Sequence, residues 1–528
     1  MQLEVCDSMD WLYPDSAVRP RARRRAALRA ARGTRPGCQL LLAGVPEGAA
    51  LRVEGGALAC AEGGRLPAPQ RFHLLSVPVE ENTGPVGFTR DGERNEHVTR
   101  RAPFRVFDVL RPMHGGSPAL AGANALLLQW PVPGRARPGL YAGSVTVRAG
   151  SEAAEVPVEL RVHRARVPAQ GTLKVTNWFS VELMAERHGL KPWSEAHWRM
   201  IRRYADLMVR SRQNMFWAPL GYVAGRREGE GAWRFDLSRW RRLVRTMLDA
   251  GGQWIEGGHV AGRAAWDSLR YDTVGPGHLP GTDPQGEAYL AALLGAVGRL
   301  LDREGWRGRC VQHVADEPHG ADVPDYRILC GIVRKHLPGV PLLDAVQNTT
   351  MAGALDIWVP LNSQYEQKRA EWEAYRAVGD ELWHYTCCFP GGKYLNRLLD
   401  QSLLRPRLLH WGNYVYDLKG YLHWGLNHYR HDQNPFEQSV VGHGGDNKLP
   451  AGDTHVVYPG ADGPWSSMRL EAMREGIEDY ELLCGVAARD RARADRIARR
   501  VFRGFTDYTE DVAAFRRAQA SLLEAADA

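Results

Sequence analysis

The chain has 528 residues, of which 44% are hydrophobic and 24% charged, and this ordinary globular balance excludes a disordered or low-complexity protein. No apolar run reaches the roughly 18 residues of a membrane span, so no membrane partner is predicted. Eight scattered cysteines form no CxxC pair, and the first residues carry acids where a signal peptide carries basic groups. Both features predict a cytoplasmic protein with reduced thiols.

The net charge of +7 is concentrated near the start of the chain. Residues 19–32 hold seven arginines and no acid, and acids elsewhere leave no second basic stripe. We interpret this segment as a solvated surface rather than a nucleic-acid arm, so no nucleic-acid partner is predicted.

Residues 1–168 contain short β-rich runs separated by Gly/Pro turns. The runs include CQLLLAG, FHLLSVPVE, ALLLQWPV and YAGSVTVRA, with no long helical pattern between them. Regularly spaced short strands of this kind predict an N-terminal β-sandwich domain. A Pro and a Gly in RVPAQGTL, residues 166–173, mark its end.

From residue 171 strand-like runs alternate with amphipathic helical stretches. The eight candidate strands are 172–179, 213–220, 252–260, 309–318, 340–348, 354–362, 381–389 and 421–429. This alternation predicts an α/β fold, a (β/α)8 TIM barrel over residues 169–485, followed by a helical C-terminal extension, 486–528.

The active site of such a barrel lies at the C-terminal ends of its strands, where this chain is rich in indoles, amides and carboxylates. Tryptophan faces stack on sugar rings and amides bind hydroxyls, so these residues predict a carbohydrate pocket. The predicted substrate-binding residues are Asn177, Trp178, Trp217, Glu256, His259, Arg263, Trp358, Asn362, Gln364, Tyr385, Trp424 and Asn427.

The sharpest feature is HVADEPHG, residues 313–320. An apolar strand ends in Asp316 and Glu317, and Pro318 then stops its regular continuation. Glycosidases use two carboxyls at the scissile bond. We therefore predict that both side chains reach the rim of the barrel and are catalytic. The alternative is that one carboxylate caps the following helix and the other is merely solvated.

The end of the seventh strand reads TCCFP, residues 386–390, and offers no carboxylate to act as a nucleophile. A 2-acetamido sugar can supply its own nucleophile, because its amide oxygen attacks the anomeric carbon and forms an oxazolinium ion. This route needs one carboxyl to orient the amide and a neighbouring acid to protonate the leaving group.

Four stretches together resemble glycoside hydrolase family 123, the β-N-acetylgalactosaminidases and their uncharacterised bacterial relatives. They are AARGTRPGCQLLL (30–42), PVPGRARPGLYAGSVTV (131–147), HVADEP (313–318) and YPGADGPWSSMRLEAMREGIEDYELL (458–483). The resemblance implies a retaining β-N-acetylhexosaminidase. It also implies that Asp316 orients the acetamido group and Glu317 is the general acid and base, with Tyr385 a candidate to hold the acetamido oxygen.

Two alternatives stay open: a glycosidase on a sugar without the acetamido group, with Glu256 as second carboxylate, and a non-catalytic carbohydrate-binding protein. No cofactor is predicted, since no GxxxxGK[ST] occurs, and the absence of HEXXH argues against a metal. Arg469, Arg474, Glu478, Asp479 and Glu481 are predicted to form ion pairs that tie their helix to the barrel. The sequence leaves the oligomeric state undetermined.

Overall fold

The computed structural model describes residues 1–229 and 232–527. Its N-terminal part contains two sheets. The first is antiparallel and joins β1 (Gln2–Asp7), β3 (Gly37–Ala43), β10 (Asn124–Gln129), β7 (Gln70–Val79) and β8 (Phe104–Pro112), in that order. The second joins β2 (Ala26–Arg32), β12 (Glu152–Arg166), β11 (Gly139–Ala149), β4 (Ala50–Gly55) and β9 (Gly116–Pro118), with β5 (Leu58–Cys60) and β6 (Arg65–Leu66) beside β11.

The two sheets share one apolar core. Along β12, buried and exposed residues alternate, as they do in a strand with one face toward a core. Leu40 and Leu126 of the first sheet belong to the same buried cluster as Val145 and Val158 of the second. The last strand ends at Arg166 and the next begins at Lys174, on either side of the predicted boundary at residue 168.

The second part contains parallel strands that match the eight predicted ranges, except that the last begins at Gly420, one residue before its range. They form three sheets: β14 (Met215–Ala218), β17 (Trp254–Gly257) and β20 (Cys310–Gln312); β21 (Leu343–Val346), β22 (Ile357–Pro360) and β23 (Glu381–Leu382); and β13 (Lys174–Asn177), β25 (Gly420–His423) and β24 (His384–Tyr385). Isolated parallel bridges link Gln312 to Leu342 and Leu361 to Tyr385. This pairing establishes a curled wall in a mixed α/β fold, and a complete (β/α)8 barrel stays a prediction.

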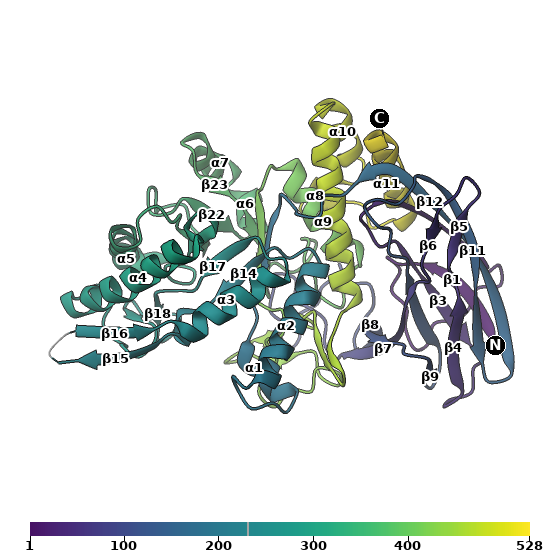
Figure 1. Ribbon diagram of the computed structural model, residues 1–528, viewed down its shortest axis with the longest axis horizontal. Helices are drawn as coiled ribbons and strands as arrows, with labels where there is room; N and C mark the ends of the chain where they lie inside the picture. The colour runs from purple at the N-terminus through teal and green to yellow at the C-terminus, as the bar shows by residue number, and fades with distance from the viewer. Residues whose placement is uncertain (230–231, 528) are drawn as a thin grey trace.

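Helices cover the outside of this wall (Figure 1). They are α1 (Val181–Arg187), α2 (Glu195–Arg210), α3 (Ser238–Ala250), α4 (Pro284–Glu304), α5 (Val323–His336), α6 (Asn362–Gln367), α7 (Arg369–Ala377) and α8 (Leu404–Val415). In α2 the Ser194 side chain caps the first turn, and Trp198, Ile201 and Met208 are buried on one face, as the helical spacing predicts. None of the described helices is both long and apolar enough to cross a membrane.

Small antiparallel hairpins occupy the loops between these elements. They pair β15 (Ala224–Glu228) with β16 (Ala232–Asp236), β18 (Ala261–Arg263) with β19 (Tyr271–Thr273), β26 (Val441–Gly442) with β27 (Lys448–Leu449), and β28 (Tyr458–Gly460) with β29 (Gly463–Trp465). The C-terminal region holds α9 (Met468–Ala487), α10 (Arg491–Ala498) and α11 (Val512–Asp527). A hairpin of β30 (Phe502–Gly504) and β31 (Asp507–Tyr508) interrupts the extension that the sequence predicts as helical.

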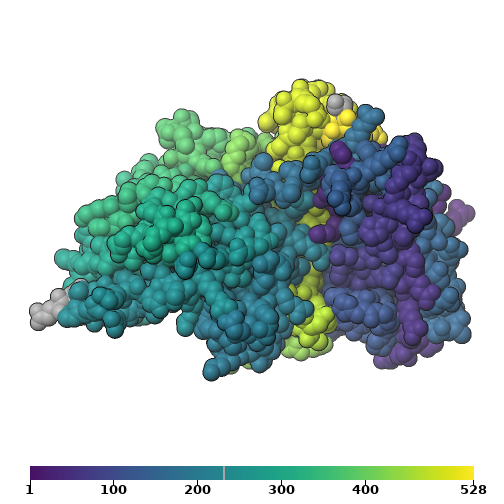
Figure 2. Space-filling view, viewed as in Figure 1, coloured from purple at the N-terminus to yellow at the C-terminus, as the bar shows by residue number. Residues whose placement is uncertain are grey.

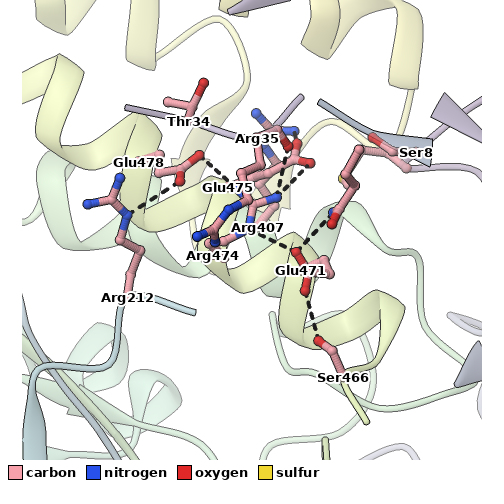
Figure 3. Close-up of polar contacts among 12 residues, drawn as sticks. Ser8, Thr34, Arg35, Arg212, Arg407, Ser466, Glu471, Arg474, Glu475 and Glu478 are labelled. Carbon is pink, nitrogen blue, oxygen red and sulfur yellow. Dashed lines mark hydrogen bonds and ion pairs between the residues drawn. The ribbon is translucent and has the colours of Figure 1, made fainter. Parts of the chain in front are cut away.

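Helix α9 stands between the N-terminal sheets and the parallel strands, and the C-terminal segments fill the seam between the two parts (Figures 1 and 2). Arg469, Arg474, Glu478 and Asp479 are buried in ion pairs, as predicted, and these pairs reach both sides. Glu481 differs from the prediction, because it accepts hydrogen bonds from Thr172 instead. Arg469 binds Asp108 of β8 with both side chains 0% exposed. Arg474 lies between Glu471 and Glu478 along the helix (Figure 3).

Candidate active site

The segment after β20 bends at Glu317. This residue has φ of +44°, in the left-handed region that a residue with a Cβ rarely adopts, and a backbone of this kind is often found where function requires it. The sequence predicts a bend caused by Pro318, whereas the structure places it one residue earlier. The bend leaves the Asp316 side chain exposed and the Glu317 side chain half-buried, both at the rim of the wall.

Arg263 holds the backbone of this bend. Its guanidinium donates to the carbonyl oxygens of Asp316 (2.9 Å) and Glu317 (3.2 Å), and it pairs with Asp322 at 2.6 Å. The Arg263 side chain is 6% exposed. Arg263 is predicted from sequence to bind substrate, but its donors are engaged with the loop, so it positions the two acids.

Asp344 binds the backbone of the same loop between the end of β20 and Asp316. Its Oδ2 accepts hydrogen bonds from the amides of Val314 (3.0 Å) and Ala315 (3.1 Å) and from the Tyr326 hydroxyl (2.6 Å). Asp344 is 0% exposed. Since a buried carboxylate must be compensated, these donors and a histidine on its other oxygen explain why it can sit in the core.

That histidine is His313, which lies between two carboxylates. Its Nδ1 is 2.6 Å from Asp344 Oδ1 and its Nε2 is 2.8 Å from Glu256 Oε1, with all three residues fully buried. Burial acts to lower the pKa of His313, but the hydrogen bonds to Asp344 and Glu256 outweigh it and raise the pKa to about 9. The ring therefore carries a positive charge at neutral pH and neutralises part of the negative charge near Asp316.

His259, His313 and Asp344 each place one potential metal-ligand atom within 4.8 Å of the others. Both nitrogens of His313 already face carboxylates, which favours a protonated ring over a metal ligand. The donor set therefore fits a metal poorly, and we derive no step through one.

Tyr385, at the end of β24, donates its hydroxyl proton to Glu317 Oε1. Burial raises the pKa of Glu317 to about 7, and the neighbouring Asp316 charge adds to this, while the hydrogen bonds from Tyr385 and Gln347 act to lower the pKa. Burial and then the charge of Asp344 also raise the pKa of Asp316, even though its side chain reaches solvent. Because each charge disfavours the other, the pair readily holds one proton near neutral pH.

A cavity of about 860 Å³ opens beside Glu317. Its wall includes the amides of Gln347, Gln364 and Gln367 and the side chains of Trp266 and Tyr394. Glu317 is the one carboxylate among the described residues that line it. A volume in this range, with a few polar groups on a largely apolar wall, is typical of small-molecule sites.

A scan of protein families matches residues 178–485 to the family described as glycoside hydrolase 123, catalytic domain. The chain belongs to glycoside hydrolase family 123. A family 123 glycoside hydrolase from Clostridium perfringens has a similar structure, with a TM-score of 0.77 and 13% identity over 99% of this chain and 98% of that one. At this identity the likeness shows the fold.

Two other solved structures are much less similar. A β-galactosidase from Bacillus circulans sp. alkalophilus has a TM-score of 0.37 at 8% identity, covering 59% of this chain and 56% of that one. A β-D-glucuronidase from Dictyoglomus thermophilum has a TM-score of 0.33 at 9% identity, covering 84% and 66%. No curated protein sequence matches the chain.

In this family 123 glycosidase, three of the predicted aromatic residues come together. The rings of Trp178 and Trp217 stack at 4.4 Å with an interplanar angle of 25°, and His259 meets Trp178 edge-on at 5.4 Å. All three are half-buried, beside His313. Gln364 lines the cavity and Trp424 is half-buried near Cys388 and Phe389.

Five other predicted substrate-binding residues are fully or almost fully buried and have hydrogen-bond partners of their own within the protein. Glu256 accepts from Thr176 and Trp178 as well as facing His313. The other four are Asn177 (bonded to Gln213 and Arg397), Trp358 (to Asp380), Asn362 (to Leu395) and Asn427 (to Ser180). Trp358 shows the reason, since it sits within β22 and faces Tyr375 of the helical layer rather than the interior.

Sequence reasoning also missed residues that line the cavity. Gln347 lies near the end of the predicted strand 340–348, and the observed β21 ends directly before it at Val346. Pro85, Val86 and Phe88 come from the N-terminal part, in the long segment between β7 and β8. The one available signal was the length of that segment, because long irregular loops in compact domains are often functional.

Proposed function

We propose that this glycosidase hydrolyses β-linked N-acetylhexosaminides, specifically N-acetylgalactosaminides, with retention of the anomeric configuration. The observation that carries the proposal is the pair of adjacent acids at the rim, Asp316 and Glu317, beside a cavity whose described lining has no other carboxylate. Where the seventh predicted strand ends, the chain has Cys387 and Cys388 instead. Glu381, at the start of β23, is engaged with Lys174 at 2.8 Å and with Trp383.

The mechanism follows from this pair. Glu317 donates its proton to the leaving oxygen while the acetamido oxygen attacks the anomeric carbon and the glycosidic bond breaks. Asp316, ionised, accepts the acetamido N–H and balances the charge of the oxazolinium ion. Glu317 then takes a proton from water, which attacks the anomeric carbon and reopens the ring.

The roles require a protonated Glu317 beside an ionised Asp316, and their environments support this. Burial raises the pKa of both carboxyls, and the charge of Asp316 raises that of Glu317 further. The His313 and Arg263 charges act to lower the pKa of Asp316. Separation of two carboxyl pKa values is how one site supplies both an acid and a base.

We also propose that the three parallel sheets form one (β/α)8 barrel, supported by the eight successive strand positions and the bridges between sheets. The Clostridium perfringens enzyme acts in glycolipid glycan hydrolysis. We propose a glycoconjugate of this kind as the natural substrate.

The test is a panel of aryl β-glycosides with and without the 2-acetamido group, with the first-formed product anomer read by NMR. We expect turnover of acetamido sugars alone, a β product, and inhibition by a thiazoline that mimics the cyclic intermediate. Equal turnover of plain glycosides, or an α product, would contradict the mechanism. Turnover of neither class would favour a carbohydrate-binding protein without activity.

The variants Glu317→Gln and Asp316→Asn test the two roles separately. We expect Glu317→Gln to lower kcat/KM by about 10²-fold or more, since general acid catalysis contributes about 10²–10⁴-fold. We expect a loss of about 10²–10³-fold for Asp316→Asn, which removes the charge that stabilises the oxazolinium ion. Glu437→Gln, whose side chain is 63% exposed in a surface ion pair, is the matched control. Activity of Glu317→Gln within a factor of two of wild type would exclude it as the acid.

A further inference from the structure

A segment of the N-terminal part reaches into the catalytic half of the molecule. Residues 80–103 connect β7 to β8 without regular secondary structure of their own. Connections of this length in a compact domain are uncommon unless they have a function. We call residues 85–88, at the centre of this connection, the tip.

Buried polar contacts anchor the connection on both sides of the tip. Asp400, which is 0% exposed, accepts from the Thr83 amide at 2.7 Å and the Thr83 hydroxyl at 2.9 Å. Beyond the tip, the Arg405 guanidinium donates to the His97 carbonyl oxygen at 2.9 Å. The anchors come from the catalytic half, so the connection is held in place against it.

The tip itself packs against two loops of the catalytic half. The Gly391 amide donates to the Val86 carbonyl oxygen at 2.6 Å, and the Phe88 ring meets the Phe389 ring edge-on at 4.8 Å. Gly87 lies so close to Phe389 that an added Cβ would be 2.2 Å from the ring. Next to the tip, Thr89 and Lys448 exchange two backbone hydrogen bonds of 2.9 and 3.0 Å. The tip is therefore fixed as one wall of the cavity beside Glu317.

This wall is apolar and open to solvent. Val86 is 68% exposed, while its backbone carbonyl oxygen is held by the Gly391 amide. Together with Pro85, Phe88, Phe389, Pro390 and Tyr394 it lines the cavity that Glu317 also lines. The tip presents no side-chain donor or acceptor, so it suits an apolar surface better than the hydroxyls of a sugar.

The positions of Asp316 and Glu317 indicate which part of the substrate this cavity would hold. Glu317, which would protonate the leaving oxygen, lines this cavity, whereas Asp316, which would hold the acetamido group of the cleaved sugar, does not. We infer that the tip forms a leaving-group subsite that binds an aglycone with an apolar face, and that Val86 selects for it. The inference rests on the proposed function, because that function assigns the leaving group to Glu317.

The test compares phenyl and methyl β-N-acetylgalactosaminides on the full chain. Val86→Asp should lower the phenyl-to-methyl ratio of kcat/KM by about tenfold, because a charge replaces an apolar contact of the size that discriminates substrates in hydrophobic pockets. Val86→Leu should keep the ratio within a factor of two. Val378→Asp, at a position 79% exposed after α7, is the matched control, and melting curves confirm that all variants fold.

A calorimetric arm separates this inference from the proposed function. In the Glu317→Gln background, phenyl glycoside should bind more tightly than methyl glycoside, and Val86→Asp should remove the difference. If wild type cleaves neither sugar but the binding difference depends on Val86, the proposed function fails while the binding of an apolar group at the tip stands. An unchanged ratio in Val86→Asp, equal binding of both glycosides, or no binding of either would overturn the subsite.

Discussion

At the scale of single residues, the site depends on one strained backbone position. Glu317 has a positive φ, and the contacts that hold it there come from Arg263 on its own carbonyl oxygen and from Tyr385 on its carboxyl group. Strain of this kind persists only when neighbouring groups over-determine the position. The place of Asp316 and Glu317 after a strand end was predictable, but the bend at Glu317 was not, because Pro318 restrains the residue before it toward extended backbone.

The hydrogen bond from Tyr385 leads to a prediction about pH. A proton donor stabilises the ionised carboxyl, so Tyr385→Phe should raise the pKa of Glu317 above its value of about 7. The acid must be protonated at the start, so the alkaline fall of kcat/KM should move to higher pH by about one unit. A profile from about pH 5 to 9 measures this, with Tyr375→Phe, in α7, as the control. If the alkaline fall of kcat/KM stays in place or moves to lower pH, the general acid is not Glu317, the residue that Tyr385 contacts.

At the scale of elements, strand positions were predictable and side-chain directions were not. Each apolar run contains an observed strand, but these strands have two to four residues in the parallel sheets, and a shift of one residue turns a side chain to the opposite face. Trp358 and Asn177 show this, because the sequence predicts both in the pocket whereas both are buried in the structure. The role of His313 is not visible in the sequence, since nothing local reveals that Asp344 and Glu256 meet it from neighbouring strands.

The position of His313 between two strands leads to a stability prediction. Its removal in His313→Gln leaves two buried carboxylates without their cation, so the free energy of unfolding should fall by about 3–5 kcal/mol. Its pKa is raised from 6.5 to about 9 in the folded state, so this stabilisation is complete below pH 6.5 and is lost as the pH rises through 9.

Urea unfolding followed by tryptophan fluorescence measures this effect. The difference between wild type and His313→Gln should therefore narrow between pH 6.5 and 9. His431→Gln, with a side chain 91% exposed, should change stability by less than about 1 kcal/mol. A pH-independent difference would show that His313 is not charged in the folded protein.

At the scale of the whole molecule, α9 joins the two halves through buried charge. Arg469 pairs with Asp108 of β8 at 2.9 Å and also donates to the carbonyl oxygens of Gly452 and His455 in the catalytic half. The sequence predicted that this helix is tied to the barrel by ion pairs. The pairing of Arg469 with Asp108 of β8 could not be predicted, because no local sequence pattern connects two residues so far apart in the chain.

Breaking this link should affect the whole fold. Asp108→Asn leaves the Arg469 charge buried without its counter-ion, and we expect a loss of about 3–5 kcal/mol in the free energy of unfolding. Glu437→Gln removes an acid from an exposed pair with Arg105, at 63% and 38% exposure, and should cost less than about 1 kcal/mol. Equal losses in urea titrations of the two variants would show that Asp108 does not stabilise the junction.

The placement of the tip has a practical consequence. The segment that matches family 123 begins at residue 178, whereas Val86 and Phe88 lie in the N-terminal part, before strands β8 to β12. A fragment trimmed to the family boundaries would lack one wall of the cavity beside Glu317 and would leave Asp400, Phe389 and Lys448 without their partners. Alignments confined to that segment also leave out Val86 and Phe88, which line the same cavity as Glu317. Substrate preferences within the family are therefore better compared on full-length chains.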